Sequence, residues 1–344
     1  MKKYQKITQV GTLLAGAFLA FVIYYHSQTK VDVAVAAEAA TKLSLVEGLD
    51  KDCAPNDVAL MPDGSLLIAD GYHKNLQKLS EGELTVFAGA DSVKNIYGVP
   101  DGGYRDGSTT EALFKEPLSI SAFRDGWAVT DADNESVRLV RDGEVRTLNA
   151  AKSFKTSETD GPTSTLQAID WKHPVGLATD EKGRLYVSDA SKGKVYRISK
   201  KGRAKTVASG LKRPTALCIA GNSLLIAQTG ANKISKLDLS VKKAKVQLVA
   251  GSGKEGLADG KASDARFSSP QGIAAAADGS IYVADTANGA LRKIQNEEVT
   301  TLISSNGKAL SSEIVSPKGL LISGQTLYIC DGFSHRLYTI NLDK

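Results

Sequence analysis

The sequence predicts an all-β protein in which six repeated units of four strands close into a ring. The 344 residues are 42% hydrophobic and 24% charged. This composition is typical of a globular domain and excludes disordered, collagen-like and disulfide-stapled chains. Short runs of Val, Ile, Leu and Tyr recur between Gly-containing turns, which is typical of strands. One pattern also recurs six times along the chain, and it is the strongest of the three observations.

Each repeat contains a proline, two further residues, a short apolar strand, a turn that usually holds Gly, a second strand, usually an aspartate, a polar turn and a third strand. The six copies begin at Pro55, Pro117, Pro174, Pro214, Pro270 and Pro317. The aspartates are Asp70, Asp131, Asp189, Asp285 and Asp331, and Gln228 replaces them in the fourth copy. We expect these aspartates to be structural, because a carboxylate at a strand end accepts hydrogen bonds from the N–H groups of the following turn.

A fourth strand follows each of the first five copies but not the sixth, which ends at Lys344. Residues 41–48, TKLSLVEG, align with the fourth strand of the third copy and can supply the missing one. We therefore expect this amino-terminal strand to pair with the last copy and to close the ring. Closure removes the exposed sheet edges that an open array would have.

The fifth copy resembles the NHL repeat almost letter for letter, since residues 270–288 read PQGIAAAADGSIYVADTAN. The preceding linker, AGSGKEGLADGKASDARFSSP at 250–270, is similar to the long glycine-rich connection of that family. The resemblance covers residues 41–344 and implies a six-bladed β-propeller of four-stranded NHL-type blades. It does not imply one function, because the family includes enzymes, RNA binders, sensor domains and scaffolds.

The amino terminus predicts a membrane anchor. Residues 1–9 contain three lysines and form a basic cytoplasmic stub, residues 10–25 (VGTLLAGAFLAFVIYY) form a signal-anchor transmembrane helix, and residues 26–40 form a tether. Lysines before an apolar segment favour an inside amino terminus, so the propeller would be the extracytoplasmic domain of a single-pass cell-membrane protein. The alternative is cleavage after the segment Ala34–Ala36, which would give a secreted or periplasmic protein.

Positive charge is concentrated in the third and fourth repeats. Residues 190–250 hold fourteen Lys and Arg and one acid, Asp238, in a chain whose net charge is +5. Within this run we expect a binding patch formed by Arg197, Lys200, Lys201, Arg203, Lys242 and Lys243. The expected partner is a protein or an anionic cell-surface polymer or lipid, and the alternative is charge that serves only solubility. Nucleic acid is not expected, because only Tyr196 interrupts the basic run and the rest of the chain is not basic.

Three histidines lie in predicted turns on one face, at His73, His173 and His335. NHL-like amidating lyases bind zinc through histidines in the channel of a six-bladed propeller, so the resemblance implies these three as candidate zinc ligands. The Asp-Gly loops offer oxygen atoms for calcium. We nevertheless expect no cofactor, with zinc and calcium as the open alternatives. The cysteines show no C-x-x-C spacing, and we interpret Cys218 and Cys330 as small buried hydrophobic residues.

The leading interpretation is a membrane-tethered binding module without enzymatic activity. Strands within a blade alternate in direction, so the long connections into each first strand share a face with the turns after each second strand. Long loops make this face the expected ligand-binding side. The first alternative is a metal-assisted lyase or hydrolase acting at the channel, and the second is a structural spacer. The sequence contains no nucleophile elbow, H-E-x-x-H motif or phosphate loop.

Overall fold

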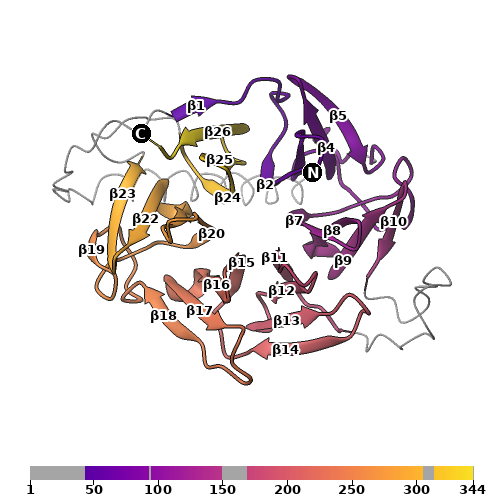
Figure 1. Ribbon diagram of the computed structural model, residues 1–344. Coiled ribbons are helices and arrows are strands. Elements are labelled where there is room, and N and C mark those ends of the chain that lie inside the picture. Colours follow the sequence, from indigo (N-terminus) through magenta and orange to yellow (C-terminus); the bar gives the residue numbers. More distant parts are fainter. Residues whose placement is uncertain (1–42, 93, 149–168, 305–313, 344) are drawn as a thin grey trace, which may run out of the picture. The chain divides into compact units, whose positions relative to one another are not determined.

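The computed structural model describes residues 43–92, 94–148, 169–304 and 314–343. In this part of the chain six antiparallel sheets are arranged around a central axis, as Figure 1 shows. Each sheet is one blade, and its first strand lies innermost. The innermost strands contact those of both neighbouring blades, including the last with the first. The predicted closed ring of six four-stranded blades is therefore confirmed.

The blades have the following elements. Blade one contains β2 (Pro55–Leu60), β3 (Leu66–Asp70), β4 (Asn75–Ser80) and β5 (Glu83–Ala88). Blade two contains β7 (Pro117–Phe123), β8 (Gly126–Asp131), the 3-10 turn η1 (Ala132–Asn134), β9 (Ser136–Arg141) and β10 (Glu144–Thr147), with β6 (Gly107–Ser108) beside β10. Blade three contains β11 (Pro174–Thr179), β12 (Leu185–Asp189), β13 (Lys194–Ile198) and β14 (Ala204–Ala208). Blade four contains β15 (Pro214–Ala220), β16 (Ser223–Gln228), η2 (Thr229–Ala231), β17 (Lys233–Asp238) and β18 (Gln247–Ala250). Blade five contains β20 (Pro270–Ala275), β21 (Ile281–Asp285), η3 (Thr286–Asn288), β22 (Ala290–Gln295) and β23 (Glu298–Ser304), with β19 (Gly260–Lys261) beside β23. Blade six contains β24 (Pro317–Ser323), β25 (Thr326–Asp331), β26 (Arg336–Asn341) and β1 (Leu43–Leu45).

The amino-terminal strand completes blade six, as the repeat alignment predicts. Strand β1 pairs antiparallel with β26, placing Leu43 opposite Ile340 and Leu45 opposite Tyr338. Of the predicted segment 41–48, the structure describes residues 43–48; Leu43–Leu45 form the strand, and Val46 N donates a further hydrogen bond to Leu337 O of β26 (2.9 Å). The first and last parts of the propeller are thereby joined by backbone hydrogen bonds.

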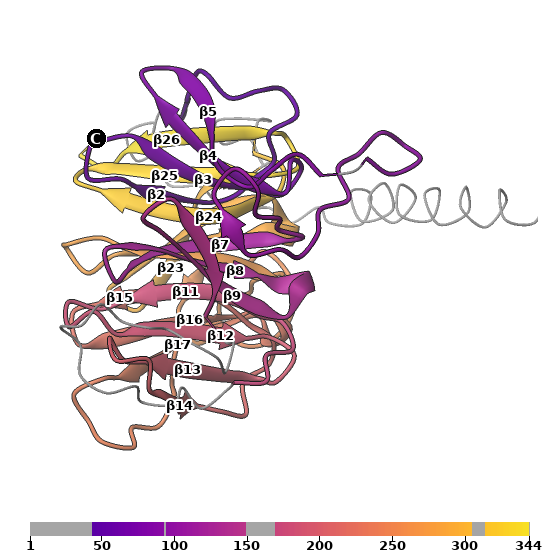
Figure 2. The ribbon, with the colours of Figure 1, turned by 90° about the vertical axis from the view of Figure 1, so that its right-hand side faces the viewer.

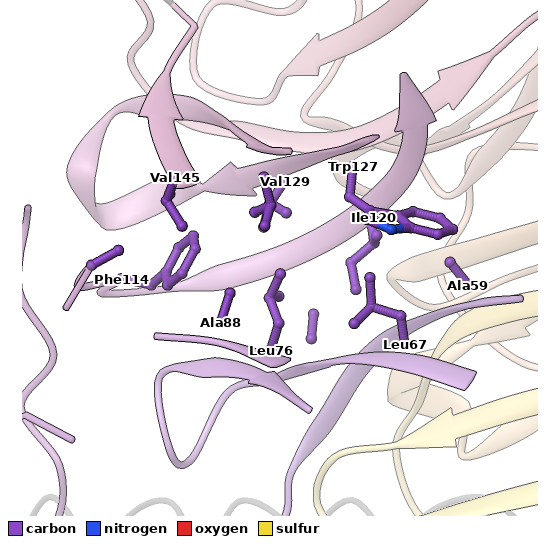
Figure 3. Packing of buried hydrophobic residues seen from close by; sticks show 12 residues of the cluster. Ala59, Leu67, Leu76, Ala88, Phe114, Ile120, Trp127, Val129 and Val145 are labelled. Carbon is purple, nitrogen blue, oxygen red and sulfur yellow. The ribbon is translucent and has the colours of Figure 1, made fainter. Parts of the chain in front are cut away.

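The hydrophobic core lies between neighbouring blades, because each sheet packs face to face against the next. Figure 3 shows the cluster between blades one and two, where Leu67 and Leu76 meet Ile120 and Val129. Phe114, from the connection between the blades, is fully buried in the same cluster. The second strands are sandwiched on both sides, so all five residues of β3 and of β12 are buried. This explains the short, uninterrupted apolar runs of the sequence.

A buried arginine fixes the long connection that enters blade two. Arg138 of β9 donates from Nη1 to Oδ2 of Asp131 (3.0 Å) and from Nη2 to Oδ1 of Asp106 (2.6 Å). Its guanidinium lies 5.0 Å from the ring centre of Phe114, and its side chain is fully buried. The connection into blade five repeats this arrangement with Arg292, Asp285, Asp259 and Phe267. The Asp-Gly pairs of the two linkers thus supply a partly exposed carboxylate for a buried arginine as well as a turn.

The repeated carboxylates cap their turns. Asp70 Oδ1 accepts hydrogen bonds from the N–H groups of Ala54, Tyr72 and His73, and Asp331 binds four N–H groups in the same way. In the fourth blade Gln228 Oε1 accepts from the N–H of Lys212. Each carboxylate therefore holds the entry to its own first strand against the turn after the second strand.

No helix in the described ranges has the length and apolar character needed to span a bilayer. The predicted basic stub (1–9), transmembrane helix (10–25) and tether (26–40) lie outside the described residues. All three cysteines are free thiols. Cys330 is fully buried, as predicted, and Cys218 is half-buried against the core between blades four and five.

Candidate functional site at the mouth of the central channel

The six inner strands line a cavity of about 360 Å³ at the centre of the ring. Each strand contributes the three residues that follow its proline, for example Gln271, Gly272 and Ile273 in blade five. The third of these positions is aliphatic in every blade, and the residues there are Val58, Ile120, Leu177, Leu217, Ile273 and Leu320. Polar side chains gather instead at the first position, nearer the face with the long loops. The channel thus has an apolar wall below a polar mouth.

The second position is small because the inner strands approach one another closely. A Cβ atom on Gly272 would overlap the backbone carbonyl of Lys318, and one on Gly176 would overlap that of Thr215. Blade one departs from this rule with Asp57, whose Oδ2 accepts hydrogen bonds from Ser119 Oγ (2.8 Å) and Ile120 N (3.0 Å) of blade two. Burial raises the pKa of Asp57 to about 6. Its oxygens are engaged in joining two blades, so the carboxylate belongs to the channel wall.

Side-chain hydroxyl groups join most neighbouring blades near the channel mouth. In four successive blades a hydroxyl donates to a backbone carbonyl of the next inner strand at 2.6–2.7 Å. The pairs are Thr130 with Val175, Ser188 with Thr215, Thr229 with Pro270 and Thr286 with Pro317. These hydrogen bonds satisfy carbonyls that the inner strands would otherwise leave without a partner.

The junction of blades six and one lacks this hydroxyl. Gly71 and Gly332 occupy the position after the capping aspartate, where blades four and five have Thr229 and Thr286. In the space that the glycines leave, Asn56 Nδ2 donates to Pro117 O (3.0 Å) and Lys318 Nζ donates to Asn56 Oδ1 (2.9 Å). A Cβ on Gly332 would lie 3.6 Å from that Nζ atom. A lysine therefore occupies this junction, where other blades place a hydroxyl.

Lys318 has the Glu116 carboxylate as an electrostatic neighbour, and Glu116 in turn has Asp133. Burial lowers the pKa of Lys318, and the Glu116 carboxylate acts in the opposite direction. Burial and the neighbouring Asp133 raise the pKa of Glu116 to about 7, while Lys74 and Lys318 oppose this shift. Oε2 of Glu116 is buried and has no hydrogen-bond partner among the described residues. The Lys318 ammonium and the Glu116 carboxyl group thus both have hydrogen-bonding capacity that the described residues leave unused.

The predicted basic patch forms a flank of blades three and four. The turn between β13 and β14 carries Lys200, Lys201 and Arg203, and the turn between β17 and β18 carries Lys242 and Lys243. All five are exposed. Arg197 is half-buried in β13, opposite Lys205 of β14. We call the six predicted residues the basic flank. Turns between third and fourth strands lie on the face opposite the long connections, one of which projects to the right in Figure 2.

The three predicted zinc ligands are not brought together. His73 Nδ1 lies 2.6 Å from Asp70 Oδ2, and the Tyr72 ring stands edge-on to His73 and to His335, with ring centres 5.0 and 6.3 Å away. His173 lies at the entry to blade three, where its carbonyl accepts the N–H of Ala190. Across the described ranges no three His, Cys, Asp or Glu side chains form a group suited to zinc or calcium. The structure thus places His73 and His335 around Tyr72 and leaves His173 apart from them, at the entry to blade three.

Sequence reasoning missed the channel mouth. Lys318, Glu116 and Asn56 are isolated polar residues in the sequence, and no motif marks them. A column-by-column comparison of the six repeats contains the signal, because Gly71 and Gly332 break the pattern that Thr229 and Thr286 set. The meaning of that break depends on blades six and one being neighbours.

Together, the closed ring and the six proline-led repeats define a β-propeller with NHL-type blades. The comparisons support an NHL repeat family for this chain. The family model described as "Teneurin NHL domain" matches residues 170–323.

Curated relatives share the repeats over part of their length. Mouse (Mus musculus) Teneurin-4 is 27% identical over 281 residues, covering 69% of this chain and 10% of that protein. Human (Homo sapiens) NHL repeat-containing protein 2 is 30% identical over 212 residues, covering 53% of this chain and 28% of that protein. Protein SUPPRESSOR OF QUENCHING 1, chloroplastic, of Arabidopsis thaliana is 38% identical over 195 residues, covering 54% of this chain and 18% of that protein. The chain thus spans less than a third of the length of these relatives.

Solved structures with the same fold have diverse functions. An auxiliary nutrient binding protein from Bacteroides thetaiotaomicron has a TM-score of 0.61 at 14% identity, with 84% of this chain and 69% of that chain covered. Virginiamycin B lyase from Staphylococcus aureus has a TM-score of 0.56 at 12% identity, with 88% and 99% covered. The gluconolactonase XC5397 from Xanthomonas campestris has a TM-score of 0.61 at 13% identity, with 90% and 93% covered. At these identities the likeness shows the fold alone.

Proposed function

We propose that this protein is an extracytoplasmic binding module, held at the membrane by its amino-terminal segment, whose basic flank contacts an anionic cell-surface polymer. The observation that carries the proposal is the concentration of charge in two neighbouring blades. Of the 43 Lys and Arg in the chain, fourteen lie at 190–250, together with one of the 38 acids. Such a distribution creates a strong local potential in a protein with a net charge of only +5.

The geometry of the flank supports a surface interaction rather than a deep pocket. Its lysines stand on two exposed turns of adjacent blades, and no ion pair between an acid and Lys200, Lys242 or Lys243 occurs in the described residues. Long flexible ammonium groups suit repeated point contacts with an anionic chain. A tether raises the local concentration of the propeller at such a surface, so weak contacts suffice.

The test uses charge reversal with a matched control. The variant carries Lys200→Glu, Lys201→Glu, Lys242→Glu and Lys243→Glu. The control reverses four exposed lysines before inner strands or in long connections, Lys51, Lys94, Lys115 and Lys254, and therefore has the same net charge. Binding to immobilised polyglutamate is measured by biolayer interferometry at low and high salt.

We expect the wild type and the control to bind polyglutamate with an affinity that falls at least about tenfold as salt screens the contacts. The flank variant should lose binding. Equal losses in both variants would show that binding depends on the net charge of the protein and not on the position of the flank lysines. Salt-dependent binding to phosphatidylglycerol vesicles that is stronger than binding to the polymer, and that is lost in the flank variant but kept in the control, would assign the flank to lipid.

A specific observation favours an enzyme as the second candidate. Glu116 and Asp133 form a carboxyl pair at the channel mouth, and the raised pKa of Glu116 suits an acid that holds its proton near neutral pH. In that role Glu116 would donate a proton to a bound substrate or remove one from it. The third alternative is a structural spacer. In that case neither the flank variant nor a Glu116→Gln variant changes binding or turnover.

A further inference from the structure

The Lys318 ammonium is incompletely bonded. It has three N–H groups, and the described residues provide one acceptor, Oδ1 of Asn56 at 2.9 Å. Lys318 lines the channel cavity and is only partly accessible to solvent. An unsatisfied N–H in such a place costs free energy, so the remaining donors favour an acceptor that enters the channel.

We propose that the loop-face mouth of the channel is a binding site for a small hydroxy-carboxylate, with its carboxylate on Lys318. The site is separate from the basic flank, which lies on the opposite face, and the inference does not rest on the proposed function. The junction of blades six and one is suited to this ligand, because Lys318 lines the cavity there and Gly332 leaves room for its ammonium beside Asn56, where blades four and five have a threonine.

The charges around Lys318 select a monoanion. Glu116 and Asp331 both act on Lys318 as negative charges, and Lys74 acts as a positive one. A dianion such as phosphate would be repelled by two nearby carboxylates, whereas a carboxylate brings one charge and two acceptor oxygens. The surroundings of the lysine therefore favour carboxylate over phosphate.

Glu116 adds the requirement for a hydroxyl group. Its Oε2 atom is buried without a partner, so a ligand hydroxyl that exchanges a hydrogen bond with it removes an unsatisfied polar atom. The channel volume of about 360 Å³ accommodates a molecule the size of one sugar ring. Below the mouth, the wall residues Ile120, Leu177 and Ile273 can pack against the apolar face of such a ring.

The experiment compares two ligands of the same size that differ at one carbon. Galacturonate has a carboxylate where galactose has a CH₂OH group. Binding of each to the full-length protein is measured by isothermal titration calorimetry at pH 7. Two variants change the site: Lys318→Met removes the ammonium at nearly constant length, and Gly332→Ser places a hydroxyl beside Nζ. The matched control is Lys254→Met, an exposed lysine of a long connection.

We expect galacturonate to bind the wild type and the Lys254→Met control at least about tenfold more tightly than galactose. Lys318→Met should abolish that difference, and Gly332→Ser should weaken galacturonate binding because its hydroxyl takes up a donor of Lys318. Equal affinity for the two sugars in the wild type overturns the proposal. So does the absence of galacturonate binding up to about 50 mM in the folded wild type.

A second measurement is made on the wild-type protein and uses one conservative variant only to assign its signal. Reductive methylation with ¹³C-formaldehyde labels lysine amines, and a resonance absent from the Lys318→Arg protein belongs to Lys318. Galacturonate should shift this resonance and slow its methylation, while galactose should do neither. Unchanged shift and rate with galacturonate contradict the proposal even if both site variants unfold.

Discussion

Single buried charges account for how the long connections are held. Arg138 and Arg292 are each fully buried and bonded to two carboxylates, one from their own blade and one from the preceding linker. Removing such an arginine leaves carboxylates buried without their cation, which is far costlier than losing an exposed ion pair.

Arg292→Ala should therefore destabilise the propeller by about 3–5 kcal/mol. The measurement is urea-induced unfolding followed by tryptophan fluorescence. The control is Arg141→Ala, since Arg141 forms an exposed pair with Asp142 and should cost less than about 0.5 kcal/mol. Similar small losses in both variants would mean that the buried triad adds little to stability.

A second prediction at this scale concerns the pH dependence of stability. The pKa of Glu116 is about 7 in the folded protein, against a reference value of 4.5. Between these values the folded state keeps a proton that the unfolded state has lost, so Glu116 makes the protein less stable as pH rises through this window.

Glu116→Gln removes this proton linkage. Relative to the wild type, the unfolding free energy of the variant should therefore increase by roughly 1–2 kcal/mol between pH 4.5 and pH 7, after allowance for partial exposure. Urea unfolding at several pH values tests this, with the exposed Glu181→Gln as the control. Parallel pH profiles for the wild type and the Glu116 variant would contradict it.

Strand β1 is short, but it closes the outer edge of blade six. It contains three residues, yet it pairs with β26 and covers the outer edge of blade six. Leu43 packs against the core cluster of that blade. Without β1, the N–H and C=O groups of β26 form an exposed sheet edge that another chain can pair with.

Deletion of residues 1–52 should lower the melting temperature by about 10 °C or more and promote aggregation on heating. The control lacks residues 1–36, which lie outside the compact unit that begins at Ala37, and should melt like the propeller with β1 in place. Differential scanning calorimetry and light scattering report the two effects. Identical melting of both truncated proteins would show that blade six does not need its fourth strand.

At the scale of the whole molecule, the ring separates two surfaces with different chemistry. The face with the long connections contains the channel mouth, where Lys318 and Glu116 leave polar atoms unsatisfied. The opposite face carries the turns of the basic flank. The two proposals assign a surface polymer to one side and a small molecule to the other, and the two sets of variants above test these roles separately.

The fold can be predicted from the sequence because each blade is specified by residues within one repeat. A proline at the start of each inner strand and a Gly-containing turn recur in every copy, and an aspartate about one strand pair later recurs in five of the six, so weak signals reinforce one another. The strand 41–48 was assigned to blade six by counting strands, and β1 confirms the pairing. Of the three histidines predicted on one face, His73 and His335 lie beside the same Tyr72 ring, and His173 lies at the entry to blade three.

The sequence by itself determined the number of blades, the ring and the charge asymmetry, since each follows from patterns within about fifty residues. Only the tertiary structure decided the chemistry of the channel. Lys318 and Asn56 are 262 residues apart, and they meet because the last blade closes against the first. Closure of the ring decides which residues of the first blade lie beside a polar residue of the last. The repeat pattern within one blade does not contain this information, because those neighbours belong to a distant part of the sequence.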